Sequence, residues 1–400
     1  MSLFCLQMTT LFVYDYDTEY RQLRINTGIG IINERQLLRI ATSTPNIRDL
    51  RLNRPVVGMS TENANRLTQL WPRVQKLDLD GSVFTEQVLG SLMAHFPLLT
   101  KLKMDAPVYV KTQLFDSIFS NHSNLVDFEC NFQYGADQNW FRSCHVPLER
   151  LAVNHLWDED ATLDTLESCC KDSLQAIKVG FGYERSPQLI RRIFSTFHQL
   201  REVSLTFLEY TALQNQPVLP HLEKLCLCRI YRQHTETLIN FLGFYSQLKE
   251  LRLEQWTVDD ESIGKLVTAL PDLRSLTVYS TQMTNAGWIK LTCLKRLEHF
   301  NLGRTNSLLE EDLQAFVRET PSLKRLTVRM ERHNSGKDYS LLFKALRDDI
   351  RSTGSNRQLL VSQDDVMYFA LDSSEECTDL AIEKFVRKTK INYKQHFGNC

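Results

Sequence analysis

Residues 248–278 read LKELRLEQWTVDDESIGKLVTALPDLRSLTV, and the phrase LxxLxL stands at both ends of this stretch. The first copy places leucines at Leu248, Leu251 and Leu253, and a second copy begins at Leu273. Apolar and polar residues alternate within each copy, which predicts a β-strand with one buried face. The next question is whether the LxxLxL phrase recurs elsewhere along the chain.

Twelve copies of the phrase can be aligned, and the steps between them range from 22 to 27 residues. A short phrase repeated at this nearly constant period is the signature of leucine-rich repeats. Separate globular α/β domains would need connections of varying length between their strands. The first position of the phrase is filled by Ile47, Val74, Leu99, Leu125, Leu148, Leu174, Leu200, Leu222, Leu248, Leu273, Leu297 and Leu323.

Each strand is followed by a pattern typical of a helix. Either Asp259 or Asp260 can cap this helix, and apolar residues recur at helical spacing from Ile263 to Leu270. Pro271 ends the helix before the next strand. Proline stands at the same place in five other copies, at positions 45, 72, 97, 220 and 321.

One strand and one helix cannot bury their apolar faces alone, so the units must stack. We therefore expect an α/β fold: a leucine-rich-repeat solenoid, or horseshoe, with a parallel β-sheet on the concave face and helices on the convex face. The expected organisation is an N-terminal capping strand and helix over residues 1–45, about twelve repeats over 46–330, and a C-terminal cap over 331–400.

The C-terminal region breaks the repeat pattern. We expect a helix over residues 337–350, an added strand at 358–361 and an interruption at 373–378. The last segment, 380–394, is amphipathic and basic. It either caps the open edge of the sheet or serves as a docking helix.

The helix side of the repeats carries a family resemblance. Residues 282–288 (QMTNAGW) and 258–263 (VDDESI) resemble the ITDxGL segment of the cysteine-containing leucine-rich repeats, of the ribonuclease-inhibitor-like superfamily. The consensus cysteine before the proline is replaced by Trp71, Phe96 or Leu270. The resemblance covers about residues 20–330. It implies the F-box/leucine-rich-repeat family, whose members are substrate receptors of cullin-type ubiquitin ligases.

An F-box is about 40 residues of helical sequence ahead of the repeats. Here residues 20–25 already resemble the first capping strand and residues 33–40 the first helix. We therefore expect no F-box in this chain, and binding to a ubiquitin-ligase adaptor would need an F-box in a longer form. The alternative is a free-standing leucine-rich-repeat scaffold or inhibitor unrelated to ubiquitination.

Composition limits the classes of partner. The 47 Lys and Arg residues balance 48 Asp and Glu residues, so the net charge is −1. This balance provides no electrostatic footprint for nucleic acid or for a membrane surface. Ten cysteines are scattered over 400 residues, unlike the dense cysteines of secreted disulfide scaffolds. We expect an intracellular protein, cytoplasmic or nuclear, with reduced thiols.

No catalytic or nucleotide-binding motif is present in the sequence, so we expect no enzyme activity, cofactor or metal. Cys226 and Cys228 are the strongest exception, because their CxC spacing on a strand puts both thiols on one face. His221 is near in sequence. Zinc would need further ligands, for example from a neighbouring repeat, and free thiols are the favoured interpretation.

Side chains that flank the buried leucines should point out of the sheet toward a partner. Their mixed signs favour a protein partner on the concave face, recognised by charge complementarity. The alternative is a merely solvated sheet face. The basic and aromatic group is the preferred contact, because Tyr and Arg are enriched in binding hot spots. The expected partner-binding residues are an acidic group, Asp78, Asp80, Asp105, Asp127 and Glu129; a central group, Glu250, Arg252 and Glu254; and the basic and aromatic group, Tyr279, His299, Arg325 and Arg329.

Overall fold

The protein is represented by a computed structural model that divides into two compact units. Unit 1 comprises Met1–Arg201 with Leu219–His221, and unit 2 comprises Glu202–Val218 with Leu222–Cys400. Each unit is treated by itself. The structure describes residues 22–26, 32–53, 56–57, 59–81, 84–106, 111–132, 140–154, 159–180, 186–206, 213–228, 235–254, 258–278, 282–305, 310–330, 359–363 and 367–371.

Unit 1 contains a parallel sheet whose strands follow one another in chain order. Neighbouring strands are in register, so that Leu50 lies beside Leu77 and Leu77 beside Leu102. A separate parallel pair is formed by β2 (Ile32–Asn33) and β4 (Val56–Val57). The strands of the sheet are β1 (Gln22–Asn26), β3 (Asp49–Asn53), β5 (Lys76–Leu79), β6 (Lys101–Asp105), β7 (Asp127–Asn131), β8 (Arg150–Val153) and β9 (Ala176–Gly180).

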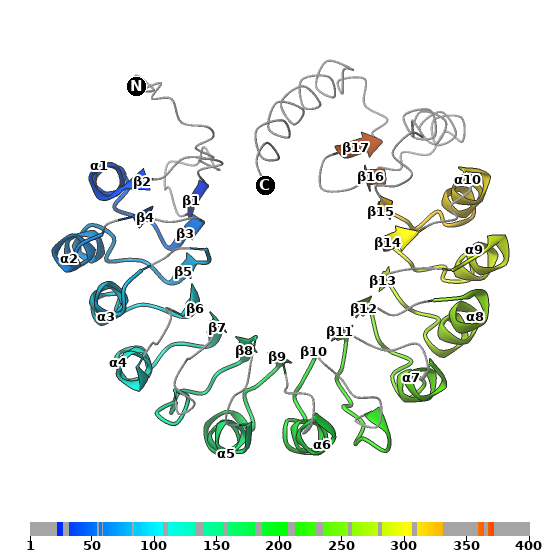
Figure 1. The fold of residues 1–400 in the computed structure, drawn as a ribbon, viewed down its shortest axis with the longest axis horizontal. Coiled ribbons are helices and arrows are strands. Elements are labelled where there is room, and N and C mark those ends of the chain that lie inside the picture. The colour runs from blue at the N-terminus through cyan, green and yellow to red at the C-terminus, as the bar shows by residue number, and fades with distance from the viewer. Residues whose placement is uncertain are drawn as a thin grey trace, which may run out of the picture. The chain divides into compact units, whose positions relative to one another are not determined.

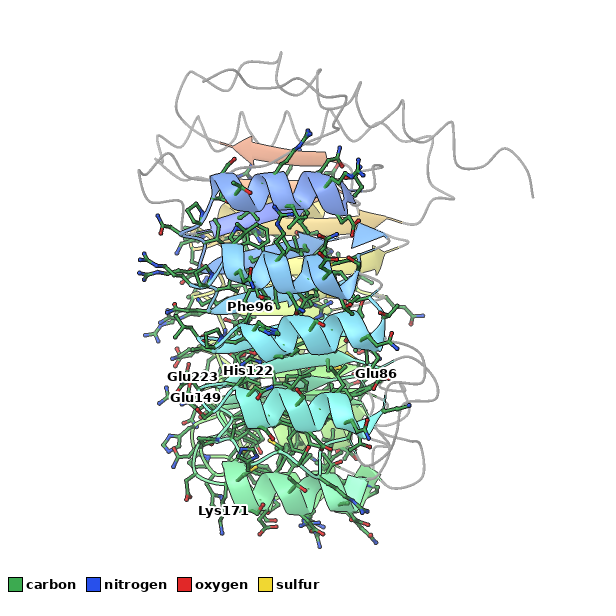
Figure 2. The ribbon with its side chains drawn as sticks, turned by 90° about the vertical axis from the view of Figure 1, so that its left-hand side faces the viewer. Glu86, Phe96, His122, Glu149, Lys171 and Glu223 are labelled. Atoms are coloured by element: carbon green, nitrogen blue, oxygen red, sulfur yellow. The ribbon has the colours of Figure 1, made fainter. Side chains whose placement is uncertain are left out.

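The helices of unit 1 cover one side of this sheet. Figure 2 shows α1 to α5 stacked side by side. These helices are α1 (Glu34–Ser43), α2 (Thr61–Leu70), α3 (Glu86–His95), α4 (Thr112–Asn121), α5 (Glu159–Cys170) and α6 (Ser186–Thr196).

Unit 2 repeats this plan. Its strands are parallel from β10 to β16, and β17 pairs with β16 antiparallel. The strands are β10 (Glu202–Thr206), β11 (Lys224–Cys228), β12 (Glu250–Glu254), β13 (Ser275–Val278), β14 (His299–Thr305), β15 (Arg325–Met330), β16 (Leu359–Gln363) and β17 (Met367–Leu371). The helices are α7 (Thr235–Leu242), α8 (Asp260–Ala269), α9 (Asn285–Leu291) and α10 (Glu310–Glu319).

In each unit the strands lie along the inner side of an arc and the helices along the outer side (Figure 1). The curvature follows from size, because helices are wider than strands and sit on the other face. The predicted leucine-rich-repeat solenoid, with a parallel sheet on the concave face and helices on the convex face, is therefore confirmed within each unit.

The twelve aligned positions form the spine of the core. All of them, from Ile47 to Leu323, have 0% of their surface exposed. Strand β12 shows the alternation within one copy, since Leu251 and Leu253 are buried while Glu250 and Arg252 are exposed. Burial of such side chains is worth about 1.5–3 kcal/mol each, so the repeated phrase supplies much of the stability of the stack.

In two repeats the described residues between the strands include no α-helix. Between β7 and β8, residues 140–143 form turns, and between β10 and β11 turns are described at residues 214–215 and 220–221. These two repeats have the shortest steps along the chain, 23 and 22 residues.

Acidic residues at helix starts join one repeat to the next. Asp259 is the cap of α8, because its side chain accepts a hydrogen bond from the backbone N–H of Ser262 at 2.9 Å. Asp260, the first helical residue, reaches the next repeat and accepts from the backbone N–H of Thr284 at 2.8 Å. The same contact recurs in unit 1, where Glu34 accepts from the N–H of Ser60 and Glu86 from the N–H of Lys111.

The residues that follow the helices explain how large side chains replace the consensus cysteine before the proline. Trp71, Phe96 and Leu270 follow directly after their helices and are buried, with 0%, 1% and 0% exposure. Trp71 also donates from its indole Nε1 to the carbonyl oxygen of Thr44 in the preceding repeat, at 2.9 Å. Large side chains thus fill the position before the proline.

The ends of the repeat array agree with the sequence where they are described. The capping strand and first helix are found as β1 and α1, and the strand expected at 358–361 is found as β16. Strand β17 was not predicted. The expected segments 337–350, 373–378 and 380–394 lie outside the described residues, and the division at 45 and 330 stays a prediction. Among the described helices, none has the length and apolar character of a membrane span.

His122 makes the stability of unit 1 depend on pH. It follows α4 and is 2% exposed (Figure 2), and burial lowers its pKa from the ordinary value of 6.5. As pH falls through about 6.5, unfolded chains take up a proton that folded His122 resists, so the free energy of unfolding falls. The loss levels off once pH is below the folded pKa.

We therefore expect His122→Asn to flatten the decrease in melting temperature between about pH 7 and pH 5. The same change at the exposed His198 is the control and should leave the pH profile unchanged. Equal profiles for wild type and His122→Asn would contradict the role of this residue.

Candidate functional site

The strands of each unit present one face that the helices leave uncovered. We call it the sheet face, meaning the outward positions of β3, β5, β6, β7 and β8 in unit 1 and of β10 to β15 in unit 2. Because the strands are parallel and in register, its side chains form rows across neighbouring repeats. One such row in unit 1 runs through Lys76, Lys101, Asp127 and Arg150.

The expected acidic group of unit 1 lies on the sheet face, where its members contact cations and hydrogen-bond donors. Lys103 lies between two of its members, with Nζ 3.0 Å from Asp80 and 3.3 Å from Glu129. Burial opposes the charged form of Lys103, but the hydrogen bond to Asp80 and the charge of Glu129 raise its pKa above the ordinary value. The single charge of Lys103 therefore offsets part of the charge of these two carboxylates.

The remaining acidic residues of this group also have partners. Lys101 Nζ lies 2.6 Å from Asp127. Asp105 accepts one hydrogen bond from the side-chain amide of Asn131 at 2.9 Å and another from the backbone N–H of Gly81 at 2.7 Å. Asp78 accepts from the backbone N–H of the residue two positions on, at 3.0 Å. The structure thus brings the group together as a charge network rather than as an open acidic patch.

The sequence pattern places Lys101 and Lys103 among the outward-facing residues, but they and Asn131 were left out of the acidic group. Glu129 follows Lys103 by 26 positions, and Asn131 follows Asp105 by 26. Adding this repeat step to a residue number gives its neighbour in the next strand. The step identifies these two pairs but not the pair of Asp80 and Lys103, which are 23 positions apart.

The central group of unit 2 is similarly paired. Lys224 bridges two strands, with Nζ 3.1 Å from Glu202 and 3.4 Å from Glu250. On the next row Arg252 forms an ion pair with Glu254 of its own strand. Glu250, Arg252 and Glu254 therefore lie on the sheet face as predicted, each held by an opposite charge.

The basic and aromatic group differs from the other two. His299 of β14 and Arg325 of β15 are neighbours in register, and both side chains are exposed. Within the described part of the chain, neither side chain forms an ion pair. Tyr279 lies outside the described residues, and the side chain of Arg329 is likewise not described.

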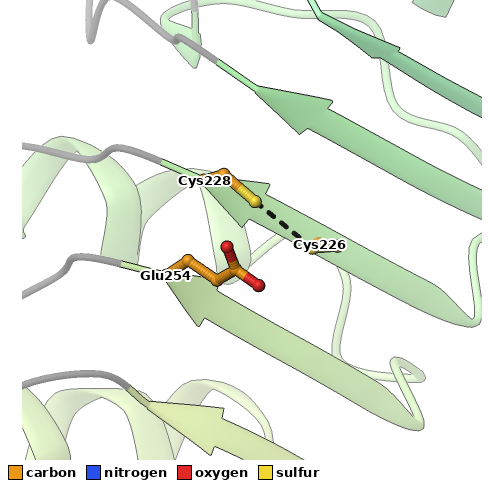
Figure 3. A group of neighbouring side chains, drawn as sticks. All are labelled: Cys226, Cys228 and Glu254. Carbon is orange, nitrogen blue, oxygen red and sulfur yellow. Dashed lines mark hydrogen bonds between the residues drawn. The ribbon is translucent and has the colours of Figure 1, made fainter. Parts of the chain in front are cut away.

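Cys226 and Cys228 lie on the same sheet face, as their spacing predicts. Their Sγ atoms are 3.7 Å apart on β11, and the carboxylate of Glu254 approaches them from β12 (Figure 3). The hydrogen bond between the two thiols lowers the pKa of Cys226 to about 7, while the same contact and burial raise the pKa of Cys228. His221 is exposed and is not part of this group.

Comparison with known proteins identifies structures similar to this chain. No protein-family model matches it, and no curated protein matches it. A chain of the yeast Rad7 and Elc1 complex is 15% identical, with a TM-score of 0.49, over 74% of this chain and 79% of that chain. An internalin (inlF) from Listeria monocytogenes is 13% identical, with a TM-score of 0.37, over 76% and 89% of the two chains. A chain of the TLR13–ssRNA13 complex is 14% identical, with a TM-score of 0.33, over 76% and 53%.

The repeat architecture is therefore established by the chain's own strand register and burial. The twelve buried positions, the in-register parallel strands and the covering helices together define a leucine-rich-repeat solenoid.

Proposed function

We propose that this chain is an intracellular protein-recognition module that holds a protein partner against its sheet face, and that it is not an enzyme. The sheet face carries charges of both signs at fixed positions. Ordered charges of mixed sign favour a protein surface with a complementary pattern, whereas nucleic acid is bound by surfaces of one sign. The seven described cysteines are free, in keeping with a reducing compartment.

The exposed pair of His299 and Arg325 carries this proposal. An arginine that already has a carboxylate partner gains little from a second one, and this Arg325 has none among the described residues. An acidic segment of a partner would supply the missing charge, with His299 beside it as a second donor. The acidic group of unit 1 is a weaker candidate, because a partner would have to displace Lys101 and Lys103.

The test is charge reversal at this pair. We expect the double variant His299→Glu/Arg325→Glu to weaken partner binding roughly 30-fold, because an interfacial arginine hot spot is worth about 2 kcal/mol or more. The partner is first defined by photo-crosslinking from Asn301, two positions beyond His299 on β14, and binding is then measured by titration. The matched control is Arg191→Glu on α6, an exposed arginine on the helix side.

Unchanged affinity in the double variant would remove this pair from the interface. Crosslinks that form as readily from the helix side, at position 191, as from position 301 would contradict recognition by the sheet face itself.

The finer part of the proposal is a role as substrate receptor for cullin-type ubiquitin ligases. Its support is the resemblance of residues 258–263 and 282–288 to the repeats of F-box/leucine-rich-repeat proteins. The corresponding residues of the two segments, Asp259 and Thr284, are the N-caps of α8 and α9. The test is co-purification with the cullin adaptor, using a form that carries an F-box. If the adaptor does not co-purify, the alternative of a free-standing leucine-rich-repeat scaffold or inhibitor is favoured.

A further inference from the structure

Two thiols and a carboxylate converge on the sheet face of unit 2. Cys226 and Cys228 are two positions apart on β11, so both side chains leave the strand on the same side. In the strand register Cys226 lies beside Arg252 and Cys228 beside Glu254. The ligand atoms of the two cysteines and Glu254 all lie within 4.8 Å of one another. All three side chains are partly exposed.

The spacing of the two sulfur atoms fits a bound metal ion. Two thiolates held at about 2.3 Å from one tetrahedral zinc ion are about 3.8 Å apart, and here the Sγ atoms are 3.7 Å apart. A disulfide would instead require the sulfurs to approach to about 2.05 Å. Residues two apart on a strand have Cα atoms separated by about 6.6 Å, near the upper limit for a disulfide. The present geometry therefore suits an ion between the sulfurs better than a bond between them.

The surrounding charges also suit a divalent cation. Two thiolates and the carboxylate of Glu254 bear three negative charges, which a divalent ion and Arg252 would balance. Arg252 already pairs with one carboxylate oxygen of Glu254. Such an outer hydrogen bond orients a ligating carboxylate, as partners of metal ligands commonly do.

We propose that Cys226, Cys228 and Glu254 form a binding site for a thiophilic divalent cation, with zinc as the expected ion. The three side chains supply three ligands of a tetrahedral site. The fourth position faces outward from the sheet face, where water or a donor from a bound molecule can occupy it. Zinc sites with three protein ligands and one open position are well known. The proposal does not depend on the identity of the protein partner.

The test is cobalt and zinc binding by the full chain under reducing conditions. We expect Co²⁺ to produce a thiolate-to-cobalt charge-transfer band and the visible bands of a tetrahedral site, and zinc to displace it. The band should be lost in Cys226→Ser and in Cys228→Ser, and reduced in Glu254→Gln. The control Cys293→Ser removes an exposed free thiol elsewhere in the chain and should leave the band intact.

A second measurement guards against variants that fold poorly. In the wild-type protein, zinc should protect two thiols from alkylation, and mass spectrometry should assign the protected residues to 226 and 228. Equal cobalt spectra in the wild type and in the Cys226→Ser/Cys228→Ser double variant would overturn the proposal. Equal alkylation of both cysteines with and without zinc would also overturn it.

Discussion

Replacing Trp140 by alanine is expected to lower the free energy of unfolding of unit 1 by about 3–5 kcal/mol. Trp140 is fully buried, with 0% exposure, in a repeat whose described residues between β7 and β8 form turns. Truncation would leave a cavity beneath the sheet, and the surrounding rings could close it only in part.

The large expected loss of unfolding free energy follows from the residues that Trp140 contacts. The indole contacts a cluster of phenylalanine rings that spans two repeats, with centroid distances between 4.6 and 6.0 Å. Aromatic pairs at such distances add about 0.5–1.5 kcal/mol beyond the area they bury. The rings are Phe115, Phe128, Phe132 and Phe141.

Trp140→Phe is the matched control. The indole Nε1 is buried and has no hydrogen-bond acceptor among the described residues, so phenylalanine removes an unsatisfied donor along with part of the ring. We expect a loss of about 1–2 kcal/mol, well below that of alanine. Both losses are measured by chemical denaturation monitored by far-ultraviolet circular dichroism, which reports the backbone and does not rely on tryptophan. Equal losses for the two variants would contradict the assignment of the alanine loss to missing ring volume.

The fold could be predicted because its determinants are local and repeated. Each copy of LxxLxL indicates which side chains are buried. The prolines at positions such as 72 and 271 indicate where the helices end. The two repeats that have no α-helix among their described residues also have the shortest steps, 23 and 22 residues. Strand β17 was not predicted, since it lies beyond the last repeat, where no period applies.

The site was predicted less well, because charge pairing depends on which residues become neighbours across strands. The outward positions were right, but the acidic group was interpreted without Lys103, which forms ion pairs with two of its members. The repeat step indicates which residues become neighbours across strands. Glu254 follows Cys228 by 26 residues, one repeat, and these two residues are register partners. Whether their atoms converge depends on side-chain rotamers, which the sequence pattern does not specify.

The second large effect is expected at Gly287, beside the contact of Asp260 with the next repeat. We expect Gly287→Ala to destabilise unit 2 by about 1–2 kcal/mol, although alanine favours helices by about 1 kcal/mol over glycine. A Cβ at Gly287 would lie 2.4 Å from Oδ1 of Asp260. The carboxylate would have to leave, and it would give up its hydrogen bonds to the backbone N–H and the hydroxyl of Thr284. Charge-assisted bonds of this kind are worth about 1.5–3 kcal/mol each.

Gly90→Ala is the control, because it makes the same change in α3 where a Cβ would meet nothing within 4 Å. There we expect a gain of about 0.5–1 kcal/mol. The sharper test is a double-mutant cycle with Asp260→Ala. Once the carboxylate is removed, alanine at 287 should cost nothing or even stabilise, since only the flexible side chain of Met283 stays close, at 3.1 Å. If the two changes were additive, the cost at Gly287 would have to come from its own helix, and the carboxylate of the preceding repeat would not be the reason for glycine at this position.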